Sequence, residues 1–108
     1  MPAPTIAAAV TALLMLAVGA FWMVMWLIGA NGYNTEQGVV ILGGNALLAL
    51  AGLLGAAWLA RALTARWLRD GWPAWGAGAL AIAVGIFAAL LAMFIGAMAL
   101  VVVVEAQR

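Results

Sequence analysis

Three long apolar stretches, separated by two short polar ones, set the pattern of this chain. The apolar stretches cover residues 5–30, 38–60 and 76–104. A helix of about 20 apolar residues crosses the hydrocarbon core of a bilayer. The pattern therefore predicts three membrane-spanning helices. The second helix is expected to continue past its apolar part, so that it covers about residues 35–69.

The two polar connections are short, which restricts how the helices can be arranged. They comprise residues 31–37 and 61–75. Connections of this length join antiparallel neighbours, and the remaining chain leaves no room for a fourth span. We therefore expect an all-α integral membrane protein. Residues 1–108 would form a single transmembrane domain, an antiparallel up-down-up bundle of three helices.

Composition supports lipid as the solvent of this chain. Apolar residues make up 70% of the sequence and charged residues 6%, whereas about a quarter of a soluble domain is charged. A soluble chain of 108 residues could not bury so much apolar surface, because small domains leave a large share of their surface wet.

The first apolar stretch also has some features of a cleavable signal peptide. Val18-Gly19-Ala20 resembles a cleavage site. However, the residues before the stretch carry no basic side chain, and the apolar run continues well past Ala20. We therefore interpret residues 5–30 as a retained membrane helix.

The distribution of arginine predicts the orientation. Arg61, Arg66 and Arg69 lie in the second connection, and the first connection has no basic residue. Basic residues of short loops stay in the cytoplasm, which predicts a multi-pass protein of the cytoplasmic (inner) membrane with N-in/C-out topology. The three arginines are also candidates for contact with lipid head groups or a partner. Alternatively, they only set topology and extend their charges to the interface.

Residues of the two connections indicate where helices begin and end. Asn31-Gly32 is a turn dipeptide that tolerates positive φ. Asn34 and Gln37 match a capping box at the start of the second helix. Gly71 is expected to end that helix, and Pro73 to prevent its resumption. Residues 31–37 could instead form a small recognition loop, but capping alone explains their residue types.

No ionisable residue lies within any predicted span, which disfavours pumps and ion-coupled transporters. Asn45 is the deepest strongly polar side chain. It would fix helix packing through an interhelical hydrogen bond or, alternatively, face a substrate or pore. Thr11 is expected to bond back to its own helix.

Small residues form stripes on the second and third predicted spans, and such stripes allow membrane helices to approach closely. In the second span the stripe contains Gly38, Asn45, Ala49, Gly52 and Ala56, opposite Leu47, Leu50, Leu54 and Trp58. In the third span it contains Gly78, Gly85, Ala89, Ala92, Gly96 and Ala99. We expect the third helix to contribute to a contact between chains.

The chain lacks Cys and His, which removes the usual ligands of zinc, haem and iron–sulfur clusters. No nucleophile–base pair or pair of carboxylates appears either. We therefore expect no enzyme activity, no metal and no cofactor, and the net charge of +1 gives no reason to expect nucleic acid. The abundance of Ala and Gly, with Arg and no Lys, points to a bacterial source.

Two functions are favoured, and a membrane-active toxin or defence effector stays open because nothing in the sequence selects it. The first is a structural or interaction subunit, either in a homo-oligomer or in a larger membrane complex. The second is a small self-associating channel with Asn45 and Thr11 facing the lumen, although one strongly polar residue per chain is a thin pore lining.

Overall fold

The computed structural model describes residues 2–107, and almost all of them are helical. Helix α1 covers Ala3–Gly29, a 3₁₀ turn η1 covers Ala30–Gly32, α2 covers Thr35–Arg69 and α3 covers Ala74–Ala106. The three α-helices are long and apolar enough to cross a membrane. This confirms the prediction of an all-helical chain with three such helices, and the observed ends lie within two residues of the predicted ones.

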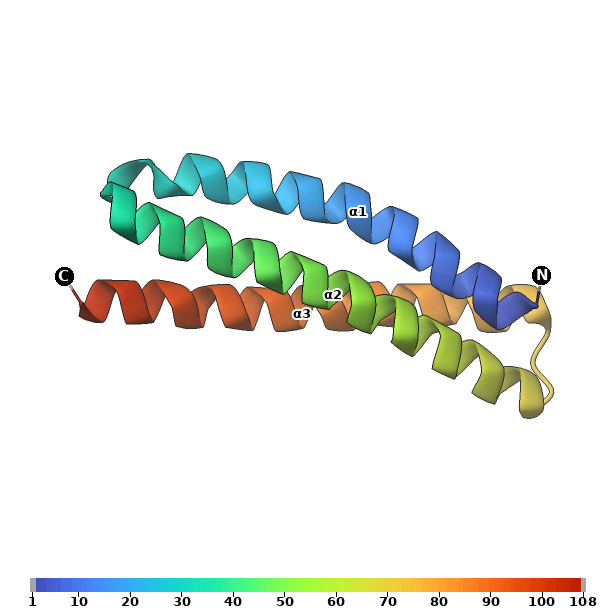
Figure 1. Cartoon of the computed structure of the whole chain (residues 1–108). Helices are drawn as coiled ribbons and strands as arrows, with labels where there is room; N and C mark the ends of the chain where they lie inside the picture. The colour runs from blue at the N-terminus through green and yellow to red at the C-terminus, as the bar shows by residue number, and fades with distance from the viewer. Residues whose placement is uncertain (1, 108) are drawn as a thin grey trace.

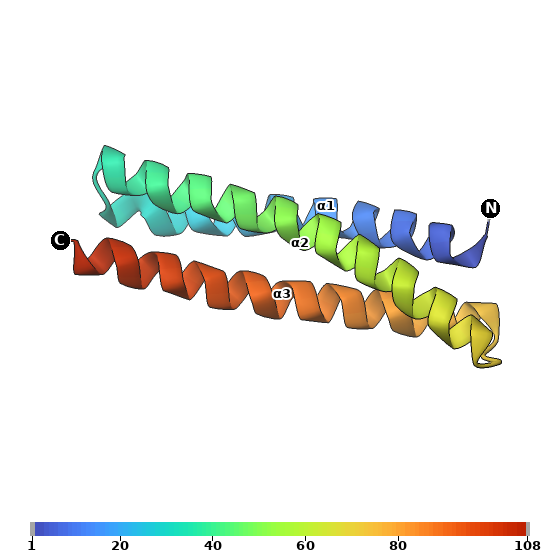
Figure 2. The ribbon, with the colours of Figure 1, turned by 60° about the horizontal axis from the view of Figure 1, so that its bottom comes forward.

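The helices form a narrow slab with α2 as the shared partner. The chain measures 54 by 21 by 14 Å along its principal axes. Figure 1 shows that successive helices run in opposite directions and that the two termini lie at opposite ends. Both α1 and α3 pack extensively against α2 and only sparsely against each other. Helix α2 crosses α3 obliquely, as the second view shows (Figure 2).

The connection between α1 and α2 corrects one sequence prediction and confirms another. Asn31 and Gly32 do not adopt positive φ, because the chain extends α1 by a 3₁₀ turn closed by the Tyr33 N–H on the Ala30 carbonyl at 3.0 Å. The predicted capping box is present. The Gln37 N–H donates to Asn34 Oδ1 at 2.8 Å, and the Asn34 N–H donates to Gln37 Oε1 at 3.3 Å.

Helix α2 ends because of the conformation of Gly71, as predicted. Gly71 has φ +93°, a conformation that side chains with a Cβ disfavour. The Trp72 N–H donates to the Trp67 carbonyl at 3.0 Å, and the Gly71 N–H donates to Leu68 at 3.2 Å. This pattern is a Schellman motif. The Trp67 and Trp72 rings stack across it with centroids 5.2 Å apart, and α3 begins directly after Pro73.

The apolar core is small and lies where the three helices meet. Met15, Ala56, Ala89 and Met93 are buried there. Most large apolar side chains point outward instead, and Phe87, for example, is 71% exposed. Lipid solvates such side chains as well as a protein core does, so membrane helices gain little from burying them.

Candidate functional site

Asn45 connects α1 to α2 in the interior of the slab. Its side chain is fully buried. Asn45 Oδ1 accepts a hydrogen bond from the indole Nε1–H of Trp22 at 3.0 Å, and Nδ2 donates to the Ile41 carbonyl at 2.8 Å. The residue therefore bonds both to a neighbouring helix and to its own, and it presents no polar atom to the surface.

Two buried threonines are bonded within their own helices. Thr11 Oγ1 donates to the Ala7 carbonyl at 2.7 Å, which confirms the expected back-bond. Thr64 Oγ1 does the same with Ala60 at 2.6 Å. Sequence reasoning missed Thr64, although a threonine at the end of an apolar helix is itself a signal for such a bond. Among residues 2–107, no buried side-chain nitrogen or oxygen lacks a partner.

Three of the five glycines in the predicted stripes lie between α2 and α3, whereas Gly38 and Gly78 have no neighbouring atom within 4 Å of a Cβ position. A Cβ on Gly85 would lie 2.9 Å from the Ala56 carbonyl oxygen. A Cβ on Gly52 would lie 2.7 Å from Met93 Sδ, and one on Gly96 would lie 2.6 Å from a methyl group of Leu48. Together with buried Ala89, these residues pack α2 against α3 within one chain.

Ala92 departs from the predicted packing stripe. It is exposed, as is Ala99, while the buried face of α3 follows a row of every fourth residue. That row contains Ala77, Ala81, Gly85, Ala89, Met93 and Ala97. The buried face therefore turns around α3 along its length, because α2 crosses it obliquely and contacts one i, i+4 ridge, not a heptad row.

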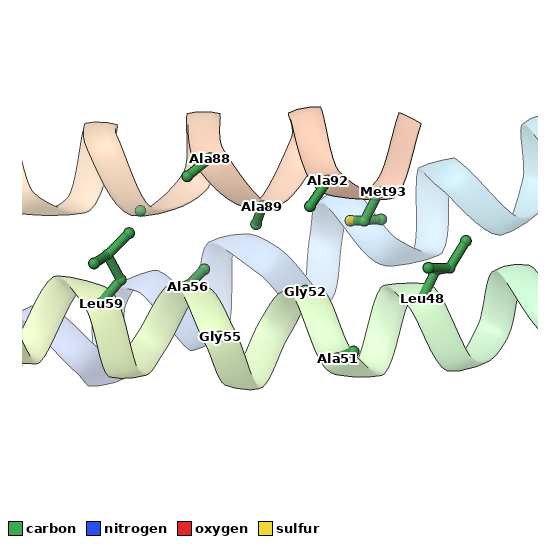
Figure 3. Close-up of a pocket in the computed structure, with 11 residues that line it drawn as sticks. Leu48, Ala51, Gly52, Gly55, Ala56, Leu59, Ala88, Ala89, Ala92 and Met93 are labelled. Atoms are coloured by element: carbon green, nitrogen blue, oxygen red, sulfur yellow. The ribbon is translucent and has the colours of Figure 1, made fainter. Parts of the chain in front are cut away.

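A hollow opens between α2 and α3 on the side away from α1, and we call it the α2–α3 groove (Figure 3). One part of it has a volume of about 270 Å³ and adjoins, at Leu48 and Ala51, a second hollow of about 440 Å³. Small side chains dominate its rim. The exposed small residues of this rim are Ala51, Gly55, Ala88, Ala92 and Ala99. Two large residues of the second hollow, Leu47 and Val103, are exposed as well.

A second groove runs between α1 and α3, with a volume of about 790 Å³. Large apolar side chains line it, in contrast to the α2–α3 groove. They include Phe21, Trp22, Met25, Trp26, Phe94 and Met98. The indole N–H of Trp22 already donates to Asn45, so this surface offers contact to apolar groups.

The end of the molecule that carries the 31–37 connection is tied to α3. Tyr33 OH donates to Glu105 Oε1 at 2.9 Å. Asn34, Glu36 and Gln37 line a small polar hollow beside α3. The sequence alone does not indicate this bond, because the two residues are 72 positions apart.

The three arginines of the other end lie on the exposed side of α2. Arg61, Arg66 and Arg69 are all exposed, and Arg66 and Arg69 fall in the last turn of the helix. Cations are favourable there, because the carbonyl ends of the helix carry partial negative charge.

No protein-family model, curated protein or solved structure matches this chain. A fold of three apolar helices does not define a function, because function resides in sites placed on a fold. The functional proposal therefore rests on the surfaces and hydrogen bonds of this chain.

Proposed function

We propose that this chain is a non-enzymatic structural or interaction subunit of a bacterial cytoplasmic membrane, and that it forms a homo-oligomer through the α2–α3 groove. Its three helices cross the bilayer in an up-down-up arrangement with the N-terminus inside and the C-terminus outside. Arg61, Arg66 and Arg69 at the end of α2 support this orientation through the positive-inside bias.

The observation that carries the proposal is a set of exposed small residues that internal packing does not use. No atom lies within 4 Å of a Cβ built on Gly55. Ala51, Ala88 and Ala92 are exposed around it. Small residues that face lipid gain nothing from their size, whereas small residues that face another helix allow close packing. The α2–α3 groove therefore suits an additional helix.

A second copy is the occupant that fits best, because closed assemblies of identical subunits are the commonest oligomers. A helix of the copy would pack against the rim alanines and bring its backbone close to Gly55. The alternative is that a different membrane protein occupies the groove. In that case the purified chain would be monomeric.

The burial of the polar side chains between the helices favours a structural subunit over a channel. Asn45 and Thr11 are fully buried, and their polar atoms are hydrogen-bonded within the chain. A pore lining needs polar groups that face the lumen. Exposing Asn45 would break its bond to Trp22, so we do not retain the channel as a second candidate.

A matched pair of glycine substitutions tests the proposal. Gly55 and Gly43 both lie on α2, are both exposed and both have open space around a Cβ, but only Gly55 borders the α2–α3 groove. Leucine at position 55 would fill the groove. Overpacking an interface by this amount weakens association roughly 5- to 150-fold.

Native mass spectrometry from several mild detergents and from nanodiscs measures the oligomeric state. Wild type and Gly43→Leu are expected as oligomers, and Gly55→Leu is expected to shift toward monomer. A wild-type chain that is monomeric in every condition would overturn the proposal. So would equal oligomer populations in the two variants.

A further inference from the structure

The end of α2 extends from the apolar span into the region where phospholipid head groups lie. Helix α2 has 35 residues, about 52 Å of helix, whereas the hydrocarbon core is about 30 Å thick. If residues 38–60 fill that core, Arg61 stands at its boundary. Arg66 then lies about 9 Å beyond Ala60 along the helix axis, and Arg69 about 13 Å beyond it. Long arginine side chains extend toward the phosphate layer from such positions.

The three arginines share one side of the helix with lipid-facing apolar residues. At about 100° per residue, Arg61, Arg66 and Arg69 fall within an arc of about 140°. Trp58 lies inside that arc, one turn nearer the apolar span, and is 70% exposed. Leu54, one turn further along the same side, is 61% exposed. Cationic groups therefore stand directly above an apolar surface, which matches the head and tail of a phospholipid.

Charge at this end of the molecule is unbalanced. Three arginines at the end of α2 accompany one acidic residue, Asp70, which leaves a formal charge of +2 there. The remaining two acids, Glu36 in the first turn of α2 and Glu105 near the end of α3, lie where those helices meet at the opposite end of the slab (Figure 1). The excess positive charge favours an anionic group over a zwitterionic one.

The geometry points to a binding site for the phosphate of an anionic phospholipid, formed by Arg61, Arg66 and Arg69 with Trp58 beneath them. Guanidinium groups donate two parallel hydrogen bonds to phosphate, which gives arginine an advantage over lysine at such sites. The acyl chains would lie along Leu54 and Trp58. This inference requires that α2 crosses the bilayer and does not depend on association between chains.

The Schellman motif gives the site a defined end. Helix α2 ends at Arg69, and Gly71 with the stacked Trp67 and Trp72 rings prevents its continuation. The last turn therefore holds Arg66 and Arg69 in fixed positions on α2. Trp72 and Trp75 are 42% and 80% exposed, which suits aromatic rings at the membrane interface.

Lipid competition measured by native mass spectrometry tests the site. The purified protein is incubated with equimolar phosphatidylglycerol and phosphatidylcholine that carry the same acyl chains, and the bound lipids are identified by mass. Wild type is expected to prefer phosphatidylglycerol. Each single change, Arg61→Gln, Arg66→Gln or Arg69→Gln, should lower that preference about fivefold.

Arg108→Gln is the control, because it removes the same charge elsewhere in the sequence and should leave the preference unchanged. The single variants keep two arginines in the connection, so the orientation signal remains. Raising the ammonium acetate concentration with wild type should also reduce the preference, since salt screens exposed charges. Equal binding of the two lipids by wild type, or an unchanged preference in all three variants, would overturn the inference.

Discussion

Replacing Gly85 with alanine tests whether α2 and α3 are held together by a close approach of their backbones. A Cβ at position 85 would lie 2.9 Å from the Ala56 carbonyl oxygen, and the Ala60 backbone nitrogen is 3.6 Å away. The nearest obstacle is backbone, so no side-chain rotation can relieve the contact. Helix α2 would have to move away by a few tenths of an ångström along much of its contact with α3.

Two effects of opposite sign determine how much Gly85→Ala changes the free energy of unfolding. Overpacking a tight contact costs about 1–3 kcal/mol. Replacing glycine by alanine within a helix stabilises it by up to about 1 kcal/mol. Gly78→Ala provides the second effect alone, because Gly78 lies on the same helix with no atom within 4 Å of its Cβ position. We therefore expect Gly85→Ala to be less stable than Gly78→Ala by about 1–3 kcal/mol.

Equilibrium unfolding in mixed detergent, followed by tryptophan fluorescence, measures the difference between the two variants. The comparison removes effects that depend only on glycine content. A Gly85→Ala protein as stable as Gly78→Ala would refute the close approach at Ala56. Because Gly85 packs within the chain, this experiment reports on the fold of one subunit and leaves association to substitutions in the α2–α3 groove.

Further predictions address orientation, the interhelical bond and the helix end. A reporter active only in the periplasm should be active when fused after Arg108 and silent when inserted near Arg66, and the reverse pattern would contradict the N-in/C-out topology. A double-mutant cycle of Asn45→Leu and Trp22→Phe in the same unfolding assay should give a coupling energy on the order of 0.6–1.7 kcal/mol, whereas additive effects would mean that the two side chains do not bond. Gly71→Ala should lower the free energy of unfolding by about 1–2 kcal/mol, because alanine resists positive φ, and an unchanged midpoint would contradict the observed cap.

Much of the fold could be predicted because lipid makes the signals strong. Apolar stretches of membrane-spanning length identify all three helices, since few other structures satisfy backbone polar groups in hydrocarbon. The capping box at Asn34 and the helix end at Gly71 could be predicted because each involves residues within a few positions of one another. The failure at Asn31-Gly32 has a local cause as well, because a 3₁₀ extension of α1 satisfies the same backbone groups with negative φ.

The contacts between helices were less accessible to sequence reasoning. Alanine and glycine occur on every side of α3, so their positions do not select one face. The predicted stripe, which includes Ala92, therefore fits the sequence as well as the i, i+4 row through Ala81, Gly85 and Ala89 does. In the structure the second row is buried, because α2 crosses α3 obliquely. The partner of Asn45 was also not identifiable. Trp22 is 23 positions away in the sequence, and only the packing of α1 on α2 brings its indole to the amide.

Counting chains in single vesicles tests the proposed homo-oligomer most directly. The chain has no cysteine, so one cysteine introduced at an exposed terminal position carries one fluorophore per copy. The labelled protein is reconstituted at increasing lipid dilution, and photobleaching steps are counted in each vesicle. If the chain is a homo-oligomer, wild type and Gly43→Leu show several steps per vesicle at dilutions where random co-capture gives one, and Gly55→Leu shows one. Single steps for wild type at every dilution would contradict it.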